Sequence, residues 1–444
     1  MTDEEARLTA FIEHCVGGRV VALERQPRWR KAWYCTVSRQ GEAISLYVRG
    51  DKQLDAEPYP GLGREAGILR ALAAGGLPVP RVHGVCDDPE AIVMDRVPGE
   101  RDISLAASDD ERRRVAFQYI EAMAAMHGLD TGPFEALGIS RPATPEDLAL
   151  AYVNANQPLY ERTKPGPEPL LEFALGWLRR NVPRDRTEAC FIHGDAGQFL
   201  FAEGKLTALH DFEASHIGDP LADLASLRVR QPTEPLGADL DAMLRHYQTI
   251  TGRAIDGWAL SYHTAAFMVT AVMALVGPLK TRGTTLHGEY LVWDLTCRRA
   301  LLWAMAECMG VAIERCPPTA GEPGRQGLWL EVLGQTLQRL DPGSDGDRLG
   351  RHAALMVVDW LRQWDRHGAE LARRDNERLA ALLGSAPPNW RQGEADLEAF
   401  VRTAGPDQDL ALLHYFAAQV EADVMLARSL GARLEGYALA PVRL

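Results

Sequence analysis

The chain has 444 residues, about three times the ~150 residues typical of one domain, which excludes a single small domain. Its composition of 46% hydrophobic and 25% charged residues, with 40 glycines and 27 prolines, suits a chain that buries a core and excludes wholesale disorder. The 48 basic residues against 61 acidic ones give a formal charge of −13, which argues against nucleic acid as a partner.

The first hundred residues alternate in the manner of a small sheet. Short β-type runs, separated by polar turns, occupy residues 20–24, 32–37, 43–49, 81–86 and 91–95. Between the third and fourth runs, residues 62–74 carry leucine and isoleucine at helical spacing. This order predicts an antiparallel sheet with one packed helix, in an N-terminal nucleotide-binding lobe that spans residues 1–98.

From residue 99 onward the pattern is mainly helical. Amphipathic segments occupy residues 110–126, 170–180, 239–251 and 291–309. A β island at residues 189–211 interrupts them, and its last two short strands meet at the turn 202–205. We therefore predict a helical lobe over residues 99–315 in which the β island carries the catalytic loop.

The last part of the chain is separated by helix-breaking residues. The stretch 316–327 carries three prolines and three glycines, which predicts a linker. Residues 328–444 are helical again without a β signal, which predicts a separate all-α domain. The sequence leaves open whether this domain covers a substrate cleft or forms a homodimer.

The cysteines and the apolar runs indicate the cellular compartment of the chain and whether it contacts a membrane. The seven cysteines are scattered without a Cys-x-x-Cys pair, which is typical of reduced thiols in a cytosolic protein. The N-terminal stretch is acidic, and the longest apolar run, Ala265 to Leu279, is shorter than the ~18 residues that span a bilayer. We expect a cytoplasmic chain without membrane contact, in which this run forms a buried helix.

Two aspartates end neighbouring strands of the β island. Asp195 follows His-Gly at the end of an apolar strand, and Asp211 ends the second strand of the hairpin that comes next. This arrangement brings the two carboxylates together, as phosphoryl transfer requires. One carboxylate orients and deprotonates the attacking hydroxyl, and the other holds the Mg²⁺ that neutralises the phosphates. We predict that Asp195 is the base and Asp211 the metal ligand.

The ordered motifs HGD, a strand pair, D-x-E and GDP-x-x-DLA resemble those of the aminoglycoside phosphotransferase and choline-kinase-like family of small-molecule kinases. The resemblance covers roughly residues 15–310. It implies an α+β, protein-kinase-like fold of two lobes, here followed by an all-α C-terminal domain. It also implies that the chain uses ATP and Mg²⁺, with Asp195 matching the catalytic aspartate and Asp211 the metal-binding one.

The same resemblance gives roles to residues of the N-terminal lobe. Arg49 takes the place of the phosphate-pairing lysine, Glu65 would be its ion-pair partner, and the turn after Met94 would hold adenine through backbone groups. Arginine keeps the charge of lysine but changes its reach. The loop between the first two strands lacks the glycines that let backbone N–H groups approach phosphate. We expect the cationic side chains of Arg28 and Arg30 to substitute for them.

Three residues near the two aspartates complete the predicted site. Gln198 follows Asp195 by three residues where the family has an asparagine five residues on, and its carboxamide oxygen can bind a hard cation. Glu213 would lie on the same side as Asp211, either as a second metal carboxylate or as a solvated surface group. Asp223, within GDP-x-x-DLA, is expected to brace the catalytic loop.

Three functions remain open: two kinase activities that differ in the acceptor, and a protein without catalytic activity. The motifs HGDAG, FLF, DFE and LxxLRxR resemble most the branch linked to acyl-CoA dehydrogenases, whose members phosphorylate hydroxyacyl-CoA. The charge of −13 favours instead an aminoglycoside or amino-alcohol kinase, since cationic acceptors suit an acidic cleft. The departures from the family motifs also allow a catalytically silent nucleotide-binding or scaffolding protein.

Overall fold

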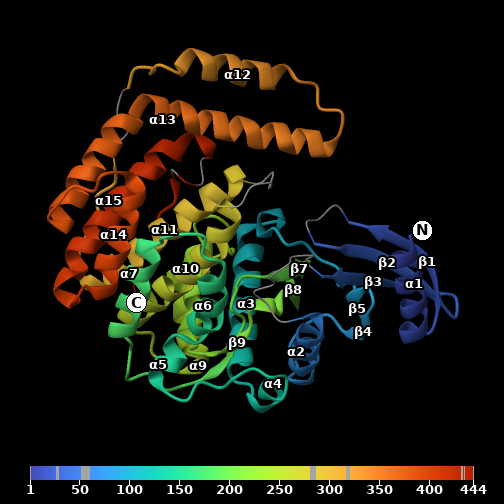
Figure 1. Cartoon of the computed structure of the whole chain (residues 1–444). Coiled ribbons are helices and arrows are strands. Elements are labelled where there is room, and N and C mark those ends of the chain that lie inside the picture. Colours follow the sequence, from blue (N-terminus) through green and yellow to red (C-terminus); the bar gives the residue numbers. More distant parts are fainter. Residues whose placement is uncertain are drawn as a thin grey trace. The chain divides into compact units, whose positions relative to one another are not determined.

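The computed structural model describes residues 2–26, 30–51, 61–280, 287–316, 321–431, 434 and 436–443. The chain divides into two compact units (Figure 1). Unit 1 comprises Met1–Ala151, Arg186–Ile255 and Val442–Leu444, and unit 2 comprises Tyr152–Asp185 and Asp256–Pro441. The helices that follow residue 327 share unit 2 with earlier helices, and the predicted division into lobes, linker and C-terminal domain stays a prediction.

The N-terminal part of unit 1 is a five-stranded antiparallel sheet in the order β1-β2-β3-β5-β4. Its strands are β1 (Arg19–Arg25), β2 (Ala32–Arg39), β3 (Glu42–Gly50), β4 (Val82–Asp87) and β5 (Glu90–Asp95). Helix α2 (Leu62–Ala74) lies between β3 and β4 in the chain. The predicted order of three strands, a helix and two strands is confirmed.

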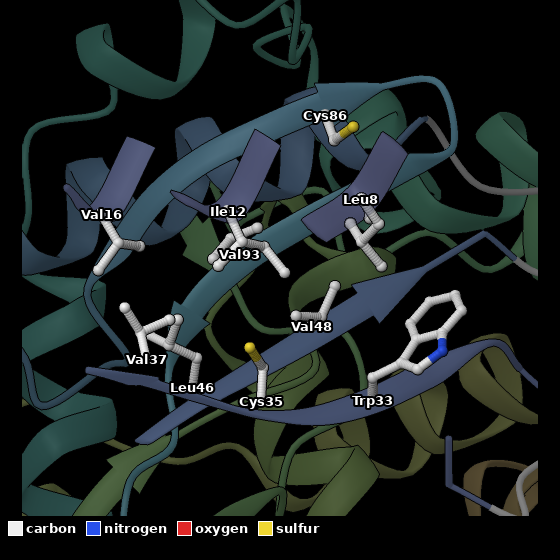
Figure 2. Packing of buried hydrophobic residues seen from close by; sticks show 11 residues of the cluster. Leu8, Ile12, Val16, Trp33, Cys35, Val37, Leu46, Val48, Cys86 and Val93 are labelled. Atoms are coloured by element: carbon white, nitrogen blue, oxygen red, sulfur yellow. The ribbon is translucent and has the colours of Figure 1, made fainter. Parts of the chain in front are cut away.

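A further helix, α1 (Asp3–Val16), is not among the predicted elements and packs against this sheet. A capping box begins it: the Glu5 N–H donates to Thr2 Oγ1 at 3.2 Å, and the Thr2 N–H donates to the Glu5 carboxylate at 2.8 Å. Its buried residues are Leu8, Ile12 and Val16, and they contact Trp33, Cys35, Val37, Leu46, Val48 and Val93 of the sheet (Figure 2). The expectation of one packed helix is therefore wrong, because α1 supplies much of the core of this lobe.

Strand alternation separates this core face from the face that carries the site. Trp33 and Val48 point into the core with α1. Their strand neighbours Tyr34, Tyr47 and Arg49 consequently point to the opposite face, since successive side chains alternate. That second face lines the cavity described below.

The rest of unit 1 is a set of helices around short strands. The helices are α3 (Asp109–His127), α4 (Gly132–Glu135), α5 (Pro145–Ala149), α8 (Leu221–Arg230) and α9 (Leu240–Thr251), with 3-10 turns at Ile103–Leu105 and Phe212–Ala214. The strands are β6 (Cys190–Ile192), β7 (Phe199–Ala202), β8 (Lys205–Leu209) and β9 (His216–Gly218). The predicted β7–β8 hairpin is confirmed, whereas β9, which pairs with β6, is not predicted.

Unit 2 is helical in the part of it that the structure describes. Its helices are α6 (Ala151–Thr163), α7 (Pro169–Arg180), α10 (Gly257–Lys280), α11 (His287–Met309), α12 (Gly327–Arg339), α13 (Asp345–Leu383), α14 (Trp390–Thr403) and α15 (Asp409–Ala427), with 3-10 turns at Pro406–Gln408 and Arg428–Leu430. A buried ion pair joins α11 to α15: Arg299 donates to both carboxylate oxygens of Glu421 at 2.6 and 2.8 Å. The apolar run that begins at Ala265 lies in α10, as predicted.

Among the described residues of unit 2, two helical segments are long and apolar enough to cross a membrane by length and composition. They are Gly257–Lys280 and Pro406–Leu430, and 78% and 61% of their most apolar windows are buried inside the protein. Core helices pass the same test when they are buried on all sides. The burial of α10 fits the prediction of a core helix.

Candidate active site

A buried carboxylate accepts hydrogen bonds from the backbone of the loop after β6. Both oxygens of Asp223, on α8, accept backbone hydrogen bonds at 2.9 Å, from the N–H groups of His193 and Gly194. His127 Nε2 lies 3.0 Å from the same carboxylate. Burial opposes ionisation of Asp223, but the hydrogen bonds from His127 and from the backbone lower its pKa below the ordinary value. Asp223 therefore braces the loop, as predicted.

Gly194 is required at its place in this loop. Its φ of 86° lies in the left-handed region, and a Cβ there would come within 2.3 Å of the carbonyl oxygen of Ala214. The close approach lets the chain pass tightly before Asp195. The HGD motif thus combines a glycine that permits the turn with an aspartate that the turn presents.

Asp195 is held by two side chains from the same region. Its carboxylate accepts from Arg230 Nη2 at 2.5 Å and from Gln198 Nε2 at 2.9 Å. Arg230, the last residue of α8, also donates through Nε to the carbonyl of Ala196 at 2.9 Å. Arg230 is not among the residues predicted for the site. The sequence feature that could have indicated Arg230 is the basic last turn of the helix that contains DLA of GDP-x-x-DLA.

We expect Arg230 to act as a positioning residue for Asp195. Arg230→Gln should lower kcat about tenfold with little change in the KM for ATP, because the carboxylate loses its orientation and the nucleotide loses no contact. Arg230→Lys should recover part of kcat, since it restores a cation. Steady-state kinetics of ADP release would check both. A parallel loss of ATP affinity, without recovery by lysine, would mean that Arg230 only stabilises the fold.

Asp211 lies at the same end of the hairpin as Asp195. The backbone N–H of His210 donates to the carbonyl of Gln198 at 3.2 Å, so the chain just after β8 lies beside the chain just before β7. Asp211 has a φ of 71°, an uncommon backbone conformation for a residue other than glycine. Such strained positions cluster at functional sites. The chain segments that carry the two predicted aspartates therefore meet at one end of the hairpin.

Arg49 connects three carboxylates on the second face of the sheet. It donates to Glu65 at 3.0 Å, to Asp211 at 2.6 Å and to Glu213 at 3.0 Å. Burial raises the pKa of Glu65. For Asp211, burial acts in the same direction, but the Arg49 guanidinium prevails and holds the pKa well below its ordinary range. The predicted ion pair of Arg49 with Glu65 is confirmed.

Arg30, which is predicted to contact the nucleotide phosphates, forms an ion pair with Glu213 in this structure. Arg30 is 6% exposed. Glu213 thus forms ion pairs with both Arg30 and Arg49. Its side chain is 20% exposed, so it is not a freely solvated surface group. Arg28 lies outside the described residues. The contribution of these arginines to nucleotide binding stays a prediction.

A cavity of about 510 Å³ opens beside these groups within unit 1. Arg49, Glu65, Met94 and Asp211 line it together with the chain segment 95–102. Tyr34 and Tyr47 also line it, and the Arg96 guanidinium lies 3.7 Å from the centroid of the Tyr34 ring. The cavity has a volume suited to a small-molecule or cofactor ligand. Its wall combines aromatic rings with the charged cluster around Arg49.

Gln198, Asp211 and Glu213 carry oxygen atoms of the kind that a hard cation binds. Among the described residues, no three His, Cys, Asp or Glu side chains cluster as a metal site. Magnesium, however, commonly takes only one or two carboxylates and completes its coordination with water and phosphate oxygens. Gln198 Oε1 here accepts from Arg101 at 3.2 Å, while Asp211 and Glu213 accept from Arg49. A cation would bind by replacing these arginine contacts.

The chain is similar to known proteins in sequence and in fold. A family model described as the phosphotransferase enzyme family matches residues 35–259. Acyl-CoA dehydrogenase family member 11 of Rattus norvegicus is 31% identical over 178 residues, which are 37% of this chain and 22% of that protein. Acyl-CoA dehydrogenase family member 10 of Mus musculus is 28% identical over 203 residues, or 41% of this chain and 19% of that protein. The chain thus spans about a fifth of the length of these curated relatives.

Among solved structures, a protein of Ralstonia eutropha JMP134 assigned to the aminoglycoside phosphotransferases is similar to this chain with a TM-score of 0.54. The similarity covers 69% of this chain and 99% of the other, at 21% sequence identity. At this identity the similarity concerns the fold. The predicted α+β, protein-kinase-like fold with helical C-terminal segments is confirmed.

Proposed function

The chain belongs to the phosphotransferase enzyme family, and we propose that it is a small-molecule kinase that transfers the terminal phosphoryl group of ATP, with Mg²⁺, to an acceptor hydroxyl. One observation carries this proposal. The Arg49–Glu65 ion pair and Asp211 line one wall of the cavity, and Asp195 lies at the same hairpin end as Asp211. Such a site positions a nucleotide, a cation and a hydroxyl for in-line transfer.

Each residue has a proposed role in this reaction. Asp195 accepts the proton of the acceptor hydroxyl and orients the hydroxyl oxygen. Arg49, held by Glu65, contacts the nucleotide phosphates, and the backbone after Met94 binds the base. The bound Mg²⁺ neutralises phosphate charge. Asp211 would hold it, with Gln198 and Glu213 as further oxygen ligands.

For the acceptor, we propose a hydroxyacyl-CoA. The support is the similarity to the curated proteins named as acyl-CoA dehydrogenase family members 11 and 10. The formal charge of −13 favours a second class, cationic aminoglycosides or amino alcohols. Arg49, Arg96 and Arg101 line the cavity beside several carboxylates, so guanidinium groups are available there to contact the phosphates of a nucleotide or of an acyl-CoA. We further propose a cytoplasmic location, because the seven cysteines are scattered along the sequence without a Cys-x-x-Cys pair.

The test is ADP release by the purified chain with Mg-ATP and a panel of hydroxyacyl-CoAs, aminoglycosides and choline-like alcohols. We expect turnover with a hydroxyacyl-CoA that disappears on Mg²⁺ chelation. Asp211→Asn should raise the Mg²⁺ concentration needed for half-maximal rate at least about tenfold, because one charged ligand is lost. Turnover confined to cationic acceptors would establish the second class.

A nucleotide-binding measurement distinguishes a kinase from a silent protein. Absence of turnover, with ATP affinity that is the same with and without Mg²⁺ and in Asp211→Asn, would contradict the kinase proposal. Asp110→Asn is a matched control, since Asp110 is exposed at the start of α3. It should leave both readouts unchanged.

A further inference from the structure

Helices α12 and α13 form an antiparallel hairpin within unit 2 (Figure 1). The N-terminal end of α12 lies beside Asp365, whose carboxylate accepts from the Gln326 N–H at 3.0 Å. At the other end, the carbonyl of Leu340 accepts from Arg351 at 2.6 Å. Residue numbers therefore rise along α12 as they fall along α13. The side of α12 that faces α13 includes Gly334, where a Cβ would come within 2.5 Å of Arg362.

Each helix carries a second apolar stripe beside this contact. On α12 and its C-terminal end the stripe is Trp329, Leu333, Thr336 and Leu340, and on α13 it is Val357, Leu361 and Trp364. The six apolar residues among them are 37% to 67% exposed. The α13 stripe continues toward its N-terminus through Ala353, Gly350 and Gly346, so it carries no charged residue over this distance. We call these two stripes together the hairpin face.

Both stripes lie on the same side of the hairpin. Each stripe lies one residue before the line of side chains that faces the other helix. Successive residues of an α-helix are about 100° apart around its axis, so each stripe is rotated by roughly 100° from that line. The rotation has the same sense in α12 and in α13. Because the helices are antiparallel, equal rotations bring both stripes to one side. The hairpin face is therefore a continuous apolar surface made by two helices.

We infer that the hairpin face binds the same face of a second copy of this chain. The spacings of four and three residues within both stripes are those of the a and d positions that pack helix against helix. Two such hairpins placed face to face make a four-helix bundle, and a two-fold axis closes it. The second copy carries the same two apolar stripes, so its hairpin face can cover the hairpin face of the first.

The exposed area agrees with a dimer of this kind. At about 200 Å² for a fully exposed large apolar side chain, the six residues offer roughly 550 Å². A standard interface buries about 800 Å² on each partner, of which flanking polar groups supply the rest. A monomer rarely leaves an apolar patch of this size uncovered without a binding role. The inference does not depend on the proposed kinase function.

Sedimentation equilibrium and light scattering of the full chain test the proposal. We expect a species of twice the 48.9 kDa chain mass at micromolar concentration. Leu333→Glu on α12, and separately Leu361→Glu on α13, should raise the dimer dissociation constant at least about 30-fold, since each buries a charge at the centre of the interface. Leu410→Glu is the matched control, because Leu410 is an equally exposed leucine on α15. It should leave the dimer intact.

Hydrogen exchange of the unmodified chain gives a readout that does not rely on the variants folding. Amide protection should rise with protein concentration within residues 327–340 and 346–364, and circular dichroism should show unchanged helix content in both glutamate variants. A wild-type chain that stays monomeric at about 100 μM would overturn the proposal. Protection that rises with concentration only elsewhere, or a dimer that survives both glutamate variants, would also overturn it.

Discussion

Replacing Asp195 with asparagine should lower turnover by about 100-fold or more, while the KM for ATP changes less than about twofold. The carboxamide keeps an oxygen that Arg230 can hold, and it has nearly the shape of the carboxylate. It cannot, however, accept the proton of the attacking hydroxyl. The loss therefore falls on the chemical step, and steady-state ADP release with the best acceptor of the panel would measure it.

Two controls make this result specific to the site. Asp110→Asn makes the same chemical change at an exposed position and should keep full turnover. Thermal unfolding of Asp195→Asn should give a midpoint close to that of the wild type, because the side chain is 38% exposed and costs little fold stability. Turnover within a few-fold of wild type would remove Asp195 from the role of base.

The parts of the fold that local pattern encodes could be predicted from the sequence. Alternating apolar residues gave the five strands of the sheet, and the glycine at the tip of 202–205 gave the hairpin, where Glu203 and Gly204 have φ of 51° and 71°. Helix α1 has an equally local signal in the Thr2-x-x-Glu5 capping box. A core of the N-terminal lobe predicted without α1 is incomplete, because α1 supplies Leu8, Ile12 and Val16.

The ion pairs of the site could be predicted only in part. The pair of Arg49 with Glu65 followed from resemblance, and the structure has it. The pairing of Arg30 with Glu213 joins residues 183 positions apart, and that of Arg230 with Asp195 joins residues 35 apart. Such contacts depend on which face of each element meets which neighbour. Periodicity and motif spacing do not contain this information for single charged residues.

The buried carboxylate below the catalytic loop should have the largest effect on stability. Asp223→Ala should lower the free energy of unfolding by about 3 kcal/mol or more, because the backbone N–H groups of His193 and Gly194 lose their acceptors while still buried. His127 Nε2 loses its carboxylate partner as well. Urea unfolding at pH 7 would measure the change. Asp110→Ala, an exposed aspartate, should change it by less than about 0.5 kcal/mol.

The pH dependence of the same residue has a definite sign. The pKa of Asp223 is lower in the folded chain than its ordinary value, so its ionised form favours folding. This contribution is complete above the pKa of an unfolded aspartate, about 3.9, and is lost as the pH falls through the lower folded value. Asp223→Asn lacks the titrating group. Its deficit in unfolding free energy should therefore be constant from about pH 8 to pH 5 and shrink below about pH 4. A deficit that grew on acidification would show that Asp223 is not held as the carboxylate that braces the loop.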